Sequence, residues 1–399
     1  MKKILFFAFL MMAAIVITSC QTDDTYFDDI IRNADTVTIH TVEINTSPVV
    51  ETPETIPTDE NDPYYDDYIE NQDFKHVVDI VFDGEKATAT GDLSHCTATC
   101  DGAHVVVNIV GKKVNLRLSG STQNGSIKIY GDYKYGLELN GLILMNPHGA
   151  AINSQNGKRM FLVLDDDTDN VLTDGTDYTE VEGESQKGVI FSEGKILVSG
   201  KGRLNILALG KSGIVSDDYI RLRPGVQTYI KASLKSGMKA NDGLFIDGGI
   251  HNITVEGDGA RGLNCESVIT MKGGRTTILT SGNSLVEEGD TTSATAVKCD
   301  SILTVTGGSL LTKSTGEGGK GLNVDGQITI TGGSVTVVTT GTHVLTAPKG
   351  IKSEVAINMT GGYLYSYSVN SQAYDAPKPT FTIAPEQWLT ARRYYIVQF

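Results

Sequence analysis

Short runs in which every second residue is apolar recur along most of the chain. Runs such as Ile328-Thr329-Ile330 and Val335-Thr336-Val337 are separated by Gly, Asn and Asp. A period of two residues is typical of β-strands, and the separating residues favour turns. The repeat region has no sustained period of 3.6 residues. The pattern therefore predicts an all-β protein and argues against a helical repeat.

The runs belong to a repeat with one anchor position per unit. Seven anchors are spaced by 24, 24, 25, 34, 25 and 29 residues: Val189, Gly213, Gly237, Gly262, Ala296, Gly321 and Gly350. The residues one, seven and nine positions after each anchor are aliphatic or methionine, and a Gly-Gly pair follows in the last five units. A strand–turn unit of this size cannot bury its apolar row alone, so neighbouring units must stack.

Stacked units of 24 to 25 residues predict a parallel β-helix solenoid, because a propeller blade needs about 40 residues or more. The usual chirality of parallel crossovers favours the right-handed form. We expect irregular N-terminal coils and a cap over residues 74–186, a regular β-helix over 187–370 and a C-terminal cap over 371–399. Insertions near 283–293 and 341–348 interrupt the period, and such insertions are expected in loops.

The chain begins like a bacterial lipoprotein precursor. Lys2 and Lys3 precede an apolar stretch over 4–17, which ends in Thr18-Ser19-Cys20. We interpret 1–19 as a lipoprotein signal peptide and Cys20 as the lipidated residue, which predicts an outer-membrane lipoprotein of a Gram-negative bacterium, exposed on the cell surface. The alternative is an ordinary secretory peptide with a chance cysteine.

Most of the negative charge lies in one segment. The net charge is −15, and residues 21–73 hold 15 acidic residues against one basic residue, Arg32. We interpret 20–73 as an extended acidic tether, rich in Pro and Thr, because like charges extend a chain. The rest of the chain is nearly neutral, so the low pI says little about its partner. The negative charge argues against nucleic-acid binding, and we expect a monomer.

The repeat resembles a bacterial family of carbohydrate-binding domain-containing β-helix lipoproteins. The resemblance is carried by the stretches 188–193, 212–218 and 320–333, in each of which an Ile or Leu is followed three residues later by an acidic residue, and in 320–333 also by Ile-Thr-Ile and Gly-Gly. It implies a right-handed β-helix similar to pectate lyases, which binds plant-type or acidic polysaccharide with calcium. The family often has Asp directly before the anchor, whereas this chain has Ser212, Ser236, Arg261, Thr295, Lys320 and Lys349.

An acidic column accompanies the repeat, four residues after each anchor: Glu193, Asp217, Asn241, Glu266, Asp300, Asp325 and Glu354. Carboxylates stacked at about 5 Å repel each other unless they are solvated or neutralised. Ca²⁺, which takes six to eight oxygen ligands, is one remedy. The densest candidate metal site is Asp217, Asp218, Asn241 and Asp242. The alternative is a turn column whose charge is met by neighbouring lysines.

Two further sets are candidate ligand-binding residues. Lys239, Lys298 and Lys352 lie two residues after their anchors, on the outward face that carries the acids. An acidic polysaccharide could lie there, its uronates meeting the lysines directly and the acids through Ca²⁺. Tyr363, Tyr365 and Tyr367 alternate along one strand, so they either stack on sugar rings or roof the C-terminal cap.

The cysteines and arginines are each open to more than one interpretation. Cys265 and Cys299 occupy one inward column of neighbouring coils, which favours stacked buried thiols over a disulfide, and Cys96 and Cys100 could pair near one turn. No catalytic residue is assigned. The leading interpretation is a binding protein. It competes with a uronate-polymer lyase, for which Arg221, Arg223 and Arg261 are candidates, and with a structural adhesin or stalk.

Overall fold

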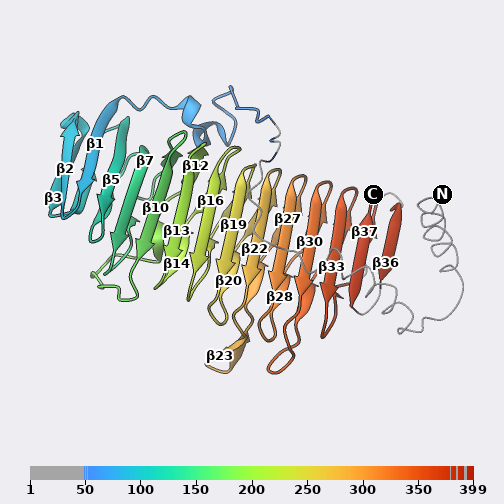
Figure 1. The fold of residues 1–399 in the computed structure, drawn as a ribbon. Coiled ribbons are helices and arrows are strands. Elements are labelled where there is room, and N and C mark those ends of the chain that lie inside the picture. The colour runs from blue at the N-terminus through green and yellow to red at the C-terminus, as the bar shows by residue number, and fades with distance from the viewer. Residues whose placement is uncertain (1–48, 50, 52, 378, 383–384, 391–392) are drawn as a thin grey trace, which may run out of the picture. The chain divides into compact units, whose positions relative to one another are not determined.

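A computed structural model describes residues 49, 51, 53–377, 379–382, 385–390 and 393–399. The predicted signal peptide, Cys20 and the first part of the acidic segment lie outside them. The described chain is a parallel β-solenoid of about 11 turns, which confirms the predicted fold class. Figure 1 shows its strands side by side, from the N-terminal β1 to the C-terminal β37. No helix among the described residues is long and apolar enough to cross a membrane.

Each regular coil contributes one strand to each of three ladders. The first ladder is a 12-stranded sheet, here called sheet B. Its strands are β3 (Cys96–Asp101), β4 (His104–Ile109), β6 (Ser126–Gly131), β8 (Ile152–Ser154), β11 (Gly188–Ser192), β14 (Ser212–Ser216), β17 (Met238–Ala240), β20 (Arg261–Cys265), β25 (Thr295–Cys299), β28 (Lys320–Val324), β31 (Lys349–Ser353) and β34 (Tyr374–Asp375).

The other two ladders share a 23-stranded sheet. The middle ladder contains β9 (Met160–Leu164), β12 (Ile196–Gly200), β15 (Tyr219–Leu222), β18 (Gly243–Ile246), β21 (Val268–Met271), β26 (Ile302–Val305), β29 (Ile328–Ile330), β32 (Ile357–Met359) and β35 (Thr380–Phe381). The third ladder contains β10 (Asp169–Asp174), β13 (Arg203–Ala208), β16 (Gln227–Ala232), β19 (Ile250–Val255), β22 (Arg275–Thr280), β27 (Ser309–Ser314), β30 (Ser334–Thr339) and β33 (Tyr363–Ser368).

The two ends of the solenoid are built differently from its middle. At the start, β1 (His76–Asp83) pairs antiparallel with β2 (Lys86–Gly91), β3 pairs antiparallel with β4, and η3 (Leu93–His95) joins these hairpins. β5 (Val114–Thr122) then pairs in parallel with β1 and with β7 (Tyr135–Asn146). At the far end, β37 (Tyr394–Gln398) pairs antiparallel with both β33 and β36 (Gln387–Thr390), so antiparallel strands cover the last coil.

The register of the repeat is the one that the sequence columns predict. Ile190 pairs with Ile214, Ile214 with Met238, and so on through Ile351, and the columns seven and nine residues after the anchors are also in register. These side chains are buried in a single apolar core. The rows therefore face inward, because alternate residues of a strand point to opposite faces.

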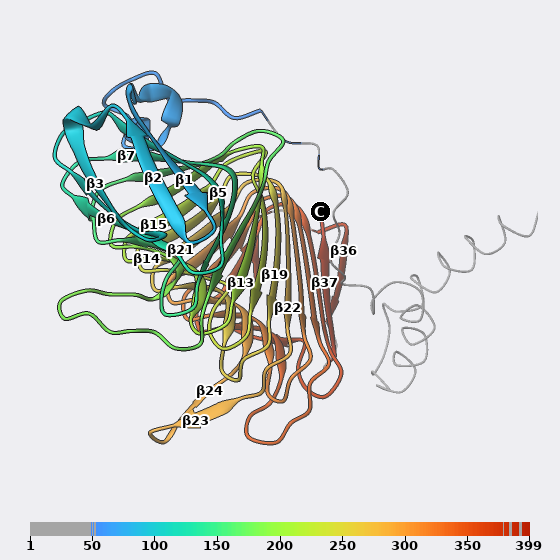
Figure 2. The ribbon, with the colours of Figure 1, turned by 60° about the vertical axis from the view of Figure 1, so that its left-hand side comes forward.

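The two insertions leave the stack. The first contains an antiparallel hairpin, β23 (Leu285–Glu287) and β24 (Asp290–Thr292), which projects from the coils in Figure 2. The second, over 341–348, is held by Glu317, whose Oε1 accepts backbone hydrogen bonds from Val344, Leu345 and Thr346. Both insertions are loops, as predicted.

Candidate functional site

A polar ladder runs along the outer face of sheet B. Its members are paired in register on five consecutive coils: Lys239, Asn264, Lys298, Asn323 and Lys352. They face outward, since the residues on either side of them along each strand are buried. Neighbouring strands are about 4.8 Å apart, so the ladder places a polar residue at each such step. Asn264 is buried and accepts a hydrogen bond from Arg261, and the other four members are half-buried.

The three ladder lysines bind the acidic column beside them. Lys239 Nζ lies 2.7 Å from Glu266, and Lys352 Nζ lies 2.6 Å from Glu354. Lys298 is the most buried of the three, with 12% of its side chain exposed, and lies 2.6 Å from both Asp300 and Asp325. The three lysines thus pair with four carboxylates of their own and the next coil, so most of the charge along the ladder is compensated.

The predicted calcium donors do not converge on one point. Both carboxylate oxygens of Asp217 lie 2.6 Å from Lys187 Nζ, and Asp218 lies 3.5 Å from Lys195 Nζ. Asn241 and Asp242 donate their backbone N–H groups to the Asp218 carbonyl. No group of three or more His, Cys, Asp or Glu side chains suited to a metal ion occurs in the described part of the chain. The donor set therefore does not fit a calcium ion in this arrangement, and calcium binding stays a prediction.

The three tyrosines of β33 are not an open platform. Tyr365 and Tyr367 are 7% and 8% exposed, and only Tyr363 is partly exposed. The strand is covered at its edge by β37, and Tyr374 stacks on Tyr395 with ring centroids 4.4 Å apart. Their burial contradicts a sugar-binding surface at Tyr365 and Tyr367 and favours the alternative, in which these tyrosines are buried at the C-terminal end of the solenoid.

The four cysteines of the described residues are free thiols. Cys265 and Cys299 are paired in register, fully buried and unlinked, and Cys96 and Cys100 are also free thiols. Burial raises the pKa of Cys265 to about 12, so the thiol stays protonated. The prediction of stacked buried thiols is confirmed.

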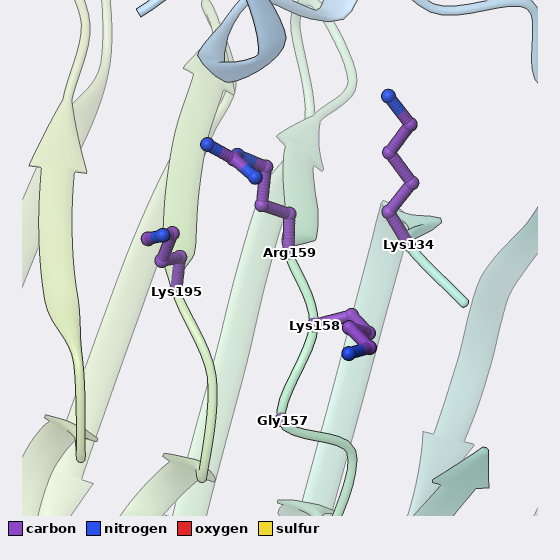
Figure 3. A pocket seen from close by; sticks show the side chains of 5 residues that line it. All are labelled: Lys134, Gly157, Lys158, Arg159 and Lys195. Atoms are coloured by element: carbon purple, nitrogen blue, oxygen red, sulfur yellow. The ribbon is translucent and has the colours of Figure 1, made fainter. Parts of the chain in front are cut away.

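A second candidate site lies on the middle ladder, and the sequence columns did not reveal it. The residues directly before β7, β9 and β12, namely Lys134, Arg159 and Lys195, fall in one column, because the next residues are in register. With Lys158 and Gly157 they line a pocket of about 330 Å³, shown in Figure 3. Every side chain in the pocket wall is therefore cationic, since Gly157 has none.

The acidic segment that precedes β1 lies against the coils that carry this pocket. In Figure 1 the blue ribbon that precedes β1 crosses several coils, and it includes η1 (Tyr65–Asp67) and η2 (Ile69–Asn71). Asp67 is 1% exposed. Its carboxylate accepts a hydrogen bond from Arg159 Nε at 3.0 Å and from the Tyr219 hydroxyl at 2.6 Å, and lies 3.3 Å from Arg221 Nε. The prediction of an extended tether is wrong for this part of the segment.

Other carboxylates of the segment reach neighbouring coils. Arg223 donates to Glu54 and Glu70 at 2.8 Å each, and Asp66 lies 2.8 Å from Lys134. Glu51 Oε1 accepts the Gly249 backbone N–H at 2.6 Å. Although its burial acts in the opposite direction, hydrogen bonds from Arg223 hold the pKa of Glu70 below its usual value. The segment thus distributes carboxylates over the coils of β7, β9, β15 and β18.

One signal in the sequence could have indicated this covered face. Met160-Phe161-Leu162 and Ile196-Leu197-Val198 are apolar without alternation, and the outward-facing Phe161 and Leu197 are each 1% exposed. A strand that is apolar on both faces is covered on both faces. The Phe74 ring packs edge-on against Phe161, with centroids 5.3 Å apart, so residues near the segment supply part of the cover.

Comparisons with known proteins assign the chain to a family. The family model described as "Carbohydrate-binding domain-containing protein" matches residues 101–373, more than half of the chain, and the chain belongs to that family. A solved polysaccharide lyase-like protein from C. thermocellum, determined as a gadolinium derivative, is 21% identical, with a TM-score of 0.48. The match covers 71% of this chain and 96% of that one. No match was found among curated proteins.

Proposed function

We propose that this protein binds a linear polysaccharide along the polar ladder of sheet B and is held at the bacterial surface by a lipid on Cys20. The observation that carries the proposal is the ladder itself, in which Lys and Asn alternate in register on five coils. A row of donors at a constant step suits a polymer better than a small metabolite. Membership of a carbohydrate-binding family supports the same ligand class.

The polymer that we favour is acidic, of the plant pectin type. Its uronate groups would replace the carboxylates of Glu266, Asp300 and Glu354 as partners of the ladder lysines. Ca²⁺ would then bridge the released protein carboxylates to the sugar. Each contact at the partly exposed Lys239 and Lys352 contributes about 1 kcal/mol or less, so binding requires several coils. Dependence on Ca²⁺ is tested by adding a chelator. Unchanged binding would contradict the role of the metal and would leave the proposed role of the ladder intact.

The decisive experiment compares binding to polygalacturonate and to a neutral glucan on a glycan array. We expect the triple variant K239A/K298A/K352A to lose most binding, whereas K201A/K231A/K313A, with the same charge change outside the ladder, should retain it. An equal loss of polysaccharide binding in both variants would show that the effect comes from net charge and not from the ladder. A wild-type protein that binds no polysaccharide with or without Ca²⁺ would favour a structural stalk.

The same sample tests the lyase alternative. Of the three arginines considered for catalysis, Arg221 and Arg223 are bound by carboxylates of the acidic segment. This arrangement supports binding rather than turnover. Incubation with polygalacturonate should therefore produce no rise in the near-ultraviolet absorbance of unsaturated uronates, and a steady rise would establish a lyase.

The anchor has its own test. Cys20→Ala should move the protein from the membrane fraction to the soluble fraction of cells, because the thioether lipid can no longer form. Ser19→Thr is a neighbouring control with an intact cysteine. A Cys20→Ala protein that stays with the membrane would contradict the anchor.

A further inference from the structure

We propose that the basic surface of the middle ladder is a second polysaccharide site, specific for carboxylates, and that residues 51 and 53–70 occupy it as an internal mimic of a polyuronate. The inference deepens the proposed function, on which it rests for the ligand class, but it uses different residues. The basic surface is defined here as Lys134, Lys158, Arg159, Lys195, Arg221 and Arg223.

The contacts within the site are those that a carboxylate ligand requires. Asp67 is held by Arg159, Arg221 and the Tyr219 hydroxyl, all on its own carboxylate. Arg223 binds Glu70 with two nitrogens, at 2.8 and 2.9 Å, in the fork geometry that favours carboxylates. The surface therefore already binds carboxylates, supplied by the same chain.

The carboxylates follow the axis of the solenoid. Glu51 meets the turn at Gly249, Glu54 and Glu70 meet Arg223, Asp67 meets Arg221 and Arg159, and Asp66 meets Lys134. These partners lie on the coils of β7, β9, β15 and β18, which are stacked at about 4.8 Å per step, and the β12 coil between β9 and β15 meets no carboxylate from the described residues of the segment. A linear polymer with one carboxylate on each sugar would present its charges along the same line.

The segment is attached in a way that permits displacement. Within the described chain, the backbone–backbone hydrogen bonds donated by residues 59–72 are local, as from Asp67 to Tyr64 and from Gln72 to Ile69. The first that joins this region to the solenoid backbone runs from Lys75 to Lys113. The segment therefore adds no strand to the sheet, and side chains hold it in place. A ligand with equivalent side groups can replace it without breaking a β-ladder.

Part of the basic surface stays open. Lys158 lines the pocket and has no carboxylate partner within the described part of the chain, and Lys195 lies 3.5 Å from Asp218 in a loose ion pair. Figure 3 shows Lys134 and Arg159 extending toward the blue ribbon of the segment, beside this pocket. The pocket is thus a point at which the first uronates can bind before the segment leaves.

The test neutralises the mimic without changing its shape. In E54Q/D67N/E70Q the segment loses three charges, and we expect polygalacturonate to bind at least about tenfold more tightly, because a larger fraction of molecules has an open site. The matched control D79N/D169N/E256Q removes three carboxylates from exposed ion pairs elsewhere. An equal gain in both triples would assign the effect to net charge and overturn the proposal.

A second measurement uses the wild-type protein, so it does not depend on whether a variant folds. Hydrogen exchange of residues 57–72 in the wild-type protein should accelerate when polygalacturonate is added and should not change with a neutral glucan. Unchanged or slower exchange with bound polymer would mean that the segment is a fixed clamp. If K239A/K298A/K352A abolishes binding while both carboxylate triples behave like wild type, the proposed function of the ladder is supported and this inference is wrong. If K239A/K298A/K352A binds like wild type while E54Q/D67N/E70Q binds more tightly, the basic surface is the binding site and the ladder is not.

Discussion

At the residue scale, the second glycine of each turn pair determines whether coils can stack. Gly333 has a φ of 76°, and an added Cβ would come within 2.7 Å of the Gly307 carbonyl carbon and 2.8 Å of its oxygen. The position therefore needs both the left-handed backbone and the missing side chain. The repeat of Gly-Gly pairs predicted this requirement directly, because the same two constraints recur on each coil.

We expect Gly333→Val to destabilise the protein by about 2 kcal/mol or more, since a non-glycine residue in this region costs about 1–3 kcal/mol before any clash. Lys352→Ala, which removes one exposed ion pair, should cost about 1 kcal/mol or less. Thermal unfolding measures both. Gly84→Val is the matched control, because Gly84 has a φ of 63° and no atom within 4 Å of an added Cβ. Equal melting temperatures for the three variants would contradict the assigned role of the turn.

The residue columns also show where sequence reasoning stops. They predicted that Cys265 and Cys299 stack inward and that Lys239 and its equivalents face outward, because both statements depend only on register. They left open whether Tyr365 stacks on sugar rings or is buried at the C-terminal cap, because an outward residue becomes buried only when another segment covers it. The strand that closes this end, β37, pairs antiparallel and does not belong to the repeat, so the columns carry no information about it.

At the element scale, the acidic segment is the largest departure from the sequence prediction. High charge predicted an extended chain, yet Arg223, Arg221 and Arg159 bind its carboxylates from positions more than 90 residues away. Paired charges no longer repel one another, so the segment can be ordered without a large apolar core of its own. Composition alone does not reveal such partners, because the ion pairs follow no repeat.

Acid should release this segment. The side-chain hydrogen bond from Lys134 lowers the pKa of Asp66, and for Glu70 the effect of burial is outweighed by Arg223, which lowers the pKa. Groups whose pKa is lowered in the docked state stabilise it fully above their usual pKa and lose that contribution as the pH falls through the lowered values. Lys134 and Arg223 stay charged throughout. We therefore expect docking to weaken below about pH 4.

Hydrogen exchange of residues 57–72, corrected for the intrinsic rate and compared with the core strands β29 and β30, measures this release. Because Asp66 and Glu70 are almost half exposed, each should contribute roughly 1 kcal/mol or less. Glu70→Gln should flatten part of the pH dependence. Protection that is the same at pH 3 and pH 6 in the wild type would show that Asp67 and the apolar contacts hold the segment unaided.

At the scale of the whole molecule, the solenoid converts a short repeat into long ladders of equivalent residues. Its apolar core and its register could be predicted from one chain, since each coil repeats the same inward positions. The caps and the covered basic face could not, because they are built from segments that occur once. The two candidate sites differ in the same way: the polar ladder follows the repeat, and the basic surface depends on contacts between unlike segments.

The length of the ligand should decide its affinity. The ladder from Lys239 to Lys352 covers five coils, or roughly 20 Å at about 4.8 Å per step. Because each exposed contact is weak, oligogalacturonides should bind more tightly with each added sugar until they span the ladder, and binding should fall with added salt. Calorimetric titration over a series of chain lengths, at two salt concentrations, measures both effects.

Lys298→Ala sharpens the same experiment, because Lys298 stands in the middle of the ladder. A short oligomer can avoid the altered coil by binding at Lys239 or at Lys352, whereas an oligomer that spans five coils must cross it. The variant should therefore weaken the longest ligands most and leave the shortest nearly unchanged, while Lys231→Ala on the third ladder should affect neither. A monosaccharide that binds as tightly as the polymer, or a loss that is the same at all lengths, would show that recognition occurs at a single pocket and that the repeat of the ladder plays no part in it.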